Sequence, residues 1–142
     1  MTPPQKQGER LFAKDYAGTL LDISLQDLKS AQALRKASEG RRENIVFLTQ
    51  QAIEKAIKAV ICHHGLPVPL VHDLGALIAR LPADVNAPHG YDLLRFNDYA
   101  GILRYERGHS ALTDEDLDAA VAAGADVLAW ASTVILKASP SV

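Results

Sequence analysis

The sequence has one cysteine, few aromatic residues and no long uninterrupted hydrophobic run. With Cys62 alone, one chain can form neither an intrachain disulfide nor a cluster of thiolate metal ligands. Aromatic residues make up 6% of the 142 residues while alanine and leucine are abundant, which favours packed helices over a sheet. No stretch approaches the roughly 18 consecutive apolar residues of a membrane span, so we expect none. Residues 1–6 lack the apolar region of a signal peptide, so we expect a cytoplasmic protein.

Positive charge is not in excess either. The formal net charge is −2, whereas a protein that coats nucleic acid is usually basic. Any contact with nucleic acid must therefore come from a local cluster of cations. The arginines available for such a cluster are Arg41, Arg42, Arg95, Arg104 and Arg107.

Apolar residues recur at steps of three and four along most of the chain, which is the spacing of amphipathic helices. The pattern predicts four long helices and one short one, at about residues 15–37, 43–64, 73–81, 91–105 and 113–137. The first dozen residues are predicted to be a frayed lead-in, and the two prolines of residues 66–69 require an extended segment. Because the loops are short, we expect one all-α domain over residues 1–142, an up-and-down bundle of four to five helices with its core at about 15–137.

Local signals support these boundaries. Gly40 and Gly65 follow predicted helix ends, and Thr113 precedes three acidic residues at the start of the last helix. The predicted buried face of the first helix consists of Leu21, Leu25, Leu28, Ala31 and Leu34.

The second helix carries a polar stripe formed by Gln51, Glu54, Lys55 and Lys58. Glu54 and Lys58 are spaced i, i+4 in the favourable order, which stabilises a helix by a few tenths of a kcal/mol. The stripe can line a groove or form a solvated helix face, and composition alone favours the solvated face.

The segment Arg104-Tyr105-Glu106-Arg107-Gly108-His109 follows the fourth predicted helix. On an uninterrupted helix, five residues span ~500°, so Arg104 and His109 would point ~140° apart. They can converge only if the helix ends between them, and Gly108 permits such a break. Arginine can hold two phosphate oxygens, and histidine can transfer protons near neutral pH, so the pair suits a phosphodiester substrate. The same spacing also arises by chance, with surface arginines and a histidine in a loop.

Cys62, His63 and His64 are adjacent on the second helix. Neighbouring residues on a helix diverge by ~100°, so these three cannot easily bind one ion. A zinc site would need further ligands, and His72 is the nearest candidate. We favour packing of Cys62 in the core and histidines that face the helix C-terminus, without a metal.

Four segments together resemble the HEPN family (higher eukaryotes and prokaryotes nucleotide-binding domain). Residues 44–58, N-I-V-F-L-T-Q-Q-A-I-E-K-A-I-K, resemble its second helix, an aromatic residue followed by Gln-Gln-Ala-x-Glu-Lys-x-x-Lys. Residues 25–31 resemble the Asp-Leu-x-x-Ala of its first helix, and residues 72–74 resemble its His-x-Leu. Arg104 and His109 fall where the family carries an Arg-x4–6-His motif. The likeness covers roughly residues 20–137.

The resemblance implies a helical bundle that usually dimerises and, in many members, cleaves RNA without a metal or cofactor. It implies Arg104 and His109 as catalytic residues. The supporting or ligand-binding candidates are Asn44, Gln51, Glu54, Lys55, Lys58, Tyr105 and Arg107. Many prokaryotic members are toxins paired with a nucleotidyltransferase-like antitoxin, and some carry a modified tyrosine two residues after the motif histidine. This chain has Ala111 there, so that route of neutralisation is not expected.

Cleavage of RNA by its own 2′-hydroxyl benefits from both a base and an acid, and the motif of one chain offers one histidine. A symmetric dimer would bring two His109 and two Arg104 side chains to one cleft, one histidine as base and the other as acid, with arginine stabilising the phosphate. We therefore expect a homodimeric ribonuclease. The alternatives are a non-catalytic module that binds a nucleotide or a nucleotidyltransferase, and a structural helical subunit.

Overall fold

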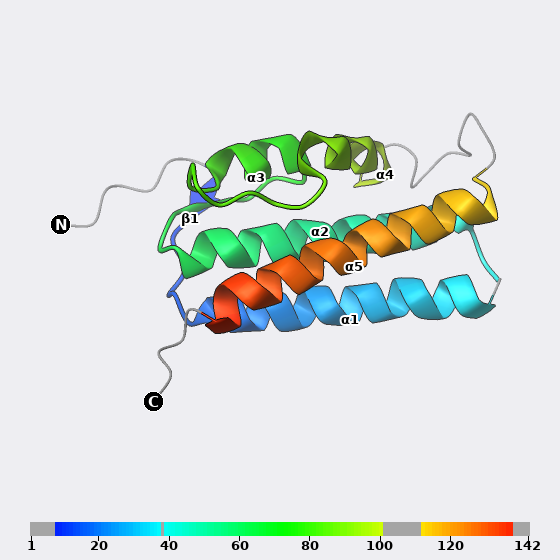
Figure 1. The fold of residues 1–142 in the computed structure, drawn as a ribbon, viewed down its shortest axis with the longest axis horizontal. Helices are drawn as coiled ribbons and strands as arrows, with labels where there is room; N and C mark the ends of the chain where they lie inside the picture. Colours follow the sequence, from blue (N-terminus) through cyan, green and yellow to red (C-terminus); the bar gives the residue numbers. More distant parts are fainter. Residues whose placement is uncertain (1–7, 38, 101–111, 138–142) are drawn as a thin grey trace.

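The computed structural model describes residues 8–37, 39–100 and 112–137 (Figure 1). Its elements in chain order are β1 (Glu9–Arg10), α1 (Tyr16–Ala37), α2 (Arg42–His63), β2 (Val68–Pro69), α3 (Leu74–Arg80), the 3₁₀-helix η1 (Gly90–Phe96), α4 (Asn97–Ala100) and α5 (Asp114–Lys137). Nearly all the regular structure is helical, which confirms the predicted all-α class.

Helix α2 lies at the centre of the bundle and contacts each of the other described helices (Figure 1). Helix α1 runs antiparallel to it, and α5 runs in the direction of α2 and packs on both. The three short helices α3, η1 and α4 follow one another along α2 and together supply the remaining leg of the up-and-down path. The predicted architecture is therefore present, with one of its legs assembled from short pieces.

The core is centred on α2, where Ile53, Ile57 and Ile61 are completely buried. On α1 the predicted apolar face is wrong at one position, because Leu25 is 36% exposed. Ser24 is buried there instead, and its hydroxyl donates to the carbonyl of Leu21 at 2.9 Å. Adjacent helical residues diverge by ~100°, so only one of Ser24 and Leu25 can face α2.

Helix α5 approaches α1 and α2 closely at Gly124. A Cβ atom there would lie 2.7 Å from Cγ2 of Thr49 on α2 and 3.2 Å from Cδ1 of Leu28 on α1. Among the described helices, α5 is the one long and apolar enough by length and composition to cross a membrane. In the structure one side of α5 packs into the bundle through Leu117, Val127 and other buried residues.

Thr113 begins α5 as predicted. Its hydroxyl accepts a hydrogen bond from the Asp116 amide at 3.1 Å, and the Asp116 carboxylate accepts one from the Thr113 amide at 2.8 Å. Asp73 caps α3 by accepting from the Gly75 amide at 2.9 Å. Gly65, just after α2, has a φ of +73°, the left-handed conformation that glycine tolerates best.

Two further sequence predictions are corrected by the structure. The predicted helix at 91–105 starts as the 3₁₀-helix η1 and becomes α-helical only at Asn97. Leu93, Phe96 and Tyr99 are spaced by three, so the three-residue turn of a 3₁₀-helix aligns Leu93 with Phe96 toward the core. The lead-in is also not frayed throughout, because Glu9–Arg10 pairs antiparallel with Val68–Pro69.

Candidate functional site

The Arg104–His109 motif, with Tyr105 and Arg107, lies outside the described residues. The structure does show the residues on either side of it. Tyr99 stands near the end of α4, and Leu112 precedes the cap of α5. The carbonyl of Leu112 accepts a hydrogen bond from Nη1 of Arg42 at 3.3 Å, so the start of α2 adjoins the point where the chain enters α5.

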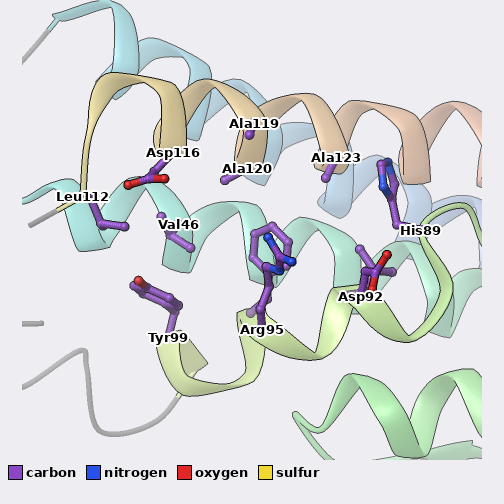
Figure 2. A pocket seen from close by; sticks show the side chains of 12 residues that line it. Val46, His89, Asp92, Arg95, Tyr99, Leu112, Asp116, Ala119, Ala120 and Ala123 are labelled. Atoms are coloured by element: carbon purple, nitrogen blue, oxygen red, sulfur yellow. The ribbon is translucent and has the colours of Figure 1, made fainter. Parts of the chain in front are cut away.

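A pocket of about 450 Å³ lies between η1–α4, α5 and the first turns of α2, and both Tyr99 and Leu112 line it (Figure 2). The apolar lining residues include Phe96 on η1 and a row of small residues on α5. These are Ala119, Ala120 and Ala123. The polar lining residues are His89, Asp92, Arg95, Tyr99 and Asp116. In Figure 2, Tyr99 and Asp116 stand at one end of the pocket and His89 and Asp92 at the other.

The polar groups of this pocket differ in how far they are already engaged. Asp116 is tied to the cap of α5, and its hydrogen bonds from Thr113 hold the pKa of its carboxyl below the ordinary value. His89 lies 2.9 Å from Asp126 through Nε2 and has a φ of +67°, an uncommon backbone conformation for a residue with a side chain. Neither the guanidinium of Arg95 nor the hydroxyl of Tyr99 has a hydrogen-bond partner within the described part of the chain.

Tyr99 is half-buried, and its surroundings keep its hydroxyl protonated. Burial raises the pKa of Tyr99, and the negative charges of Glu43, Asp116 and Asp98 raise it further. A protonated phenol can donate a hydrogen bond as well as accept one. This end of the pocket therefore offers a neutral donor beside several carboxylates.

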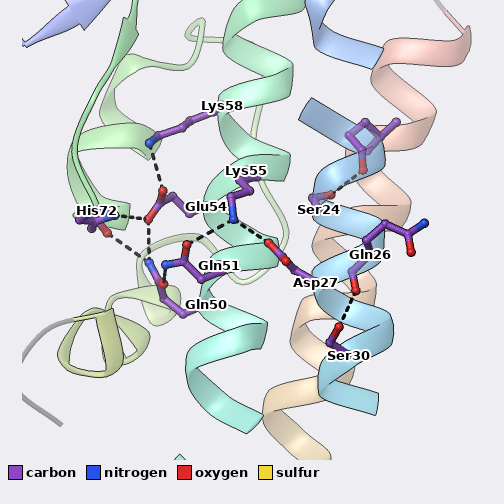
Figure 3. A network of polar contacts seen from close by, with 11 residues as sticks. Ser24, Gln26, Asp27, Ser30, Gln50, Gln51, Glu54, Lys55, Lys58 and His72 are labelled. Carbon is purple, nitrogen blue, oxygen red and sulfur yellow. Dashed lines mark hydrogen bonds and ion pairs between the residues drawn. The ribbon is translucent and has the colours of Figure 1, made fainter. Parts of the chain in front are cut away.

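The polar stripe of α2 forms a partly buried network, together with Gln50, His72 and Asp27 (Figure 3). The Glu54 side chain is 3% exposed, so the solvated-face interpretation is wrong for this residue. Its carboxylate accepts from Nε2 of Gln50 at 3.1 Å and Nζ of Lys58 at 3.0 Å, and lies 2.9 Å from Nδ1 of His72. The predicted i, i+4 pair of Glu54 and Lys58 is confirmed.

The rest of the stripe is also engaged. Nζ of Lys55 donates to Asp27 on α1 at 2.6 Å and to Oε1 of Gln51 at 3.3 Å. Gln51 in turn donates to Oε1 of Gln50 at 2.6 Å. Because these groups bond to one another, the stripe does not present an open groove. Asn44 is separate from it, exposed in the first turn of α2.

The expected arginine cluster is largely neutralised where the structure describes it. Arg42 pairs with Asp114 at 2.7 Å, and Arg41 lies 3.8 Å from Glu43. Arg95 differs from both because it faces the pocket without an acidic partner among the described residues.

The Cys62 segment is packed as expected. Cys62 is buried, with Sγ 3.3 Å from the carbonyl of Ala13, and burial raises the pKa of its thiol. Burial likewise lowers the pKa of the neighbouring His63. Over residues 8–37, 39–100 and 112–137, no three His, Cys, Asp or Glu side chains group so as to hold a metal ion.

The chain folds into an up-and-down helical bundle with a polar network along α2 and a pocket beside α5. The chain belongs to the HEPN family, whose domain model matches residues 17–134. It is similar to a solved structure, the crystal structure of TT1696 from Thermus thermophilus, with a TM-score of 0.69 and 26% sequence identity over 84% of this chain and 98% of that one. A comparison with curated proteins finds no match.

Sequence reasoning missed the pocket and several members of the network. Gln50 stands four residues before Glu54, which is a helical contact spacing that was available in the sequence. The three-residue spacing of Leu93, Phe96 and Tyr99 was the signal for the pocket wall. No comparable sequence signal pointed to His89, because its partner Asp126 lies 37 residues away.

Proposed function

We propose that the protein is a metal-independent endoribonuclease that acts as a homodimer. The observation that carries the proposal is the sequence Arg104-x4-His109 in a chain of the HEPN family. Its support from the structure is the position of the flanking residues Tyr99 and Leu112, which line a pocket together with Arg95. Assignment to the toxin half of a toxin–antitoxin pair is a further part of this proposal and rests on the family alone.

In the proposed reaction, the 2′-hydroxyl of one nucleotide attacks the adjacent phosphorus. One His109 takes the hydroxyl proton, and the bond between phosphorus and the leaving 5′-oxygen breaks. The second His109, from the other protomer, gives a proton to that oxygen, which leaves a 2′,3′-cyclic phosphate and a 5′-hydroxyl. Arg104 stabilises the negative charge on the phosphate as it becomes five-coordinate.

The direct test is cleavage of mixed single-stranded RNA in EDTA by the wild type and by His109→Ala. General acid–base catalysis contributes about 10²–10⁴-fold, so we expect the variant to lose at least a hundredfold in rate. His64→Ala is the matched control, because His64 is exposed just beyond α2, away from the motif in sequence. Equal cleavage by wild type and His109→Ala, or no cleavage by a folded dimer, would refute the proposal.

A second candidate is a non-catalytic module that binds a nucleotide or a nucleotidyltransferase. The pocket of about 450 Å³ favours it, because that volume falls within the range of small-ligand sites. The α2 stripe does not supply its groove, since those side chains bond to one another. Binding of a nucleotide without any RNA cleavage would support this candidate.

A further inference from the structure

We propose that the pocket between η1–α4 and α5 binds one unpaired nucleotide of a single-stranded RNA, with the base against the alanine side of α5 and the backbone phosphate at Arg95. The inference rests on the proposed ribonuclease function and names a substrate-binding site for it. Neither the Arg-x4-His motif nor the α2 network supplies these residues.

The volume and the apolar side of the pocket suit a nucleobase. Its volume of about 450 Å³ falls within the range of small-ligand sites. Ala119, Ala120 and Ala123 have short side chains, so a flat ring can approach the backbone of α5 closely. Phe96 of η1 also lines the pocket, and the ring of Tyr99 on α4 stands across from α5 (Figure 2). Unpaired RNA bases are typically held between apolar and aromatic surfaces of this kind.

Two polar groups in the lining of the pocket suit the phosphate and the base or ribose of one nucleotide. Arg95 has no acidic partner among the described residues, and its guanidinium can bind two phosphate oxygens. The Tyr99 hydroxyl, which likewise has no hydrogen-bond partner there, can donate to a base or to a ribose hydroxyl. Both groups line the same pocket, so one nucleotide can engage both.

The charge balance of the pocket selects among nucleotides. Asp92 and Asp116 line the pocket together with Arg95, so the carboxylates outnumber the arginine. A nucleoside triphosphate carries several negative charges and would meet these carboxylates at close range. A nucleotide within an RNA strand carries one negative charge, so the repulsion is smaller and a contact from Arg95 can offset it. The carboxylates can accept hydrogen bonds from the amino group of a base.

The pocket is also linked to the motif by a short distance along the chain. Three peptide units separate His109 from Leu112, so their Cα atoms are at most about 11 Å apart in any conformation. Leu112 lines the pocket. A nucleotide bound there therefore lies within a short stretch of RNA from the proposed catalytic histidine.

The test uses the His109→Ala protein, which would keep the RNA intact, and a fluorescein-labelled single-stranded RNA decamer of mixed sequence. Binding is followed by fluorescence anisotropy in EDTA at two salt concentrations. Ala119→Leu fills the pocket, and Ala122→Leu is its matched control, because Ala122 is likewise exposed on α5 but lines a different surface. Arg95→Gln removes the proposed phosphate contact, and Lys29→Gln removes one charge from the exposed side of α1.

We expect Ala119→Leu and Arg95→Gln each to weaken binding about tenfold, since one base contact contributes that much in single-strand binding proteins. The two control variants should change it less than about twofold. Circular dichroism and thermal melting verify that each variant folds. Equal weakening by Ala119→Leu and Ala122→Leu would overturn the inference. The inference would also be overturned if ATP bound more tightly than the decamer and if Ala119→Leu abolished that ATP binding.

The two proposals fail in distinguishable ways. RNA cleavage that depends on His109, together with unchanged binding by all four variants, would reject the pocket and leave the ribonuclease. Selective loss of RNA binding in Ala119→Leu and Arg95→Gln, without cleavage by the wild type, would support the pocket and reject the ribonuclease.

Discussion

The α2 network and the pocket beside α5 contain similar residue types but use them differently. In the network, Glu54 contacts three side chains, and Lys55 bonds to both Asp27 and Gln51. In the pocket, Arg95 and Tyr99 have no such partner among the described residues. The polar side chains of the network bond to one another, whereas Arg95 and Tyr99 are not bonded by other described residues.

This contrast separates stability from binding. A buried polar group that is fully bonded within the protein contributes to a single arrangement of the helices, and removing one partner leaves the others unsatisfied. A polar group that faces a pocket without a partner costs little to remove and is available to a ligand. The network is therefore expected to stabilise the fold, and the pocket is expected to bind.

The largest effect on stability is expected for Glu54→Ala. The change would leave Lys58, whose side chain is 13% exposed, without its carboxylate. Removal of one partner of a buried ion pair lowers the free energy of unfolding by about 3–5 kcal/mol. We expect the lower value, about 3 kcal/mol, because the second partner His72 is exposed and can bond to water instead. Urea denaturation measures the loss, with Asp22→Ala on the exposed side of α1 as control. If the urea midpoint of Glu54→Ala were unchanged and its RNA binding weakened, Glu54 would belong to the binding surface. The network and the pocket would then not differ in the way described above.

An intermediate effect is expected for Gly124→Ala, on the core side of α5. Alanine favours helix over glycine by up to about 1 kcal/mol, but its Cβ would meet Thr49 at 2.7 Å. Overpacking of this kind costs about 1–3 kcal/mol, so we expect a net loss of about 1–2 kcal/mol.

Thr49→Ser removes the opposing methyl group and keeps the hydroxyl that bonds to Ile45. A double-mutant cycle by urea denaturation should therefore show favourable coupling between Gly124→Ala and Thr49→Ser. Greater stability of the single Gly124→Ala variant would show that α5 can move away from α2 freely. Ala123, the preceding residue, lines the pocket and lets the same assay compare the two sides of α5.

The smallest effect concerns the acids at the start of α5. Arg42 lowers the pKa of Asp114, and hydrogen bonds from Thr113 lower the pKa of Asp116. The native state therefore binds fewer protons than the unfolded chain at acidic pH. This stabilisation is complete above the ordinary carboxyl pKa of about 4 and is lost as the pH falls through the lowered native values.

Urea midpoints at pH 7 and pH 3 measure this loss. The double variant Asp114→Asn and Asp116→Asn should be less stable at neutral pH and should depend less on pH in the acidic range. The same acid dependence in both proteins would show that these two carboxyl groups do not anchor the start of α5. Asp116 would then be available to bind a ligand in the pocket.

The helices and their ends were predictable because their signals are local. Steps of three and four residues, Gly65, Asp73 and Thr113 each act within one or two turns, so the sequence around them contains the physical cause. The prediction was wrong at Leu25 and in the type of helix at Gly90–Phe96, where packing against α2 selected between local alternatives.

The resemblance to HEPN domains identified the family, and the matched residues 17–134 confirm it. The roles of Arg104 and His109 stay predictions that the proposed assays test. The supporting residues predicted on α2 fall into two groups, one within the polar network and one exposed, and their spacing in the sequence did not show this. Glu54 and Lys55 belong to the internal network, while Asn44 is exposed near the start of the helix.

The amino-acid sequence alone was sufficient for the class of fold, the main helices and the family, since all of these depend on short-range patterns. Only the folded chain shows which polar residues are internal. Lys55 bonds to Asp27, which is 28 residues away in the sequence, and Glu54 contacts His72, which is 18 residues away. Arg95 has no acidic partner within the described ranges. These outcomes depend on how α1, α3 and α5 pack around α2, and helix periodicity does not encode that packing.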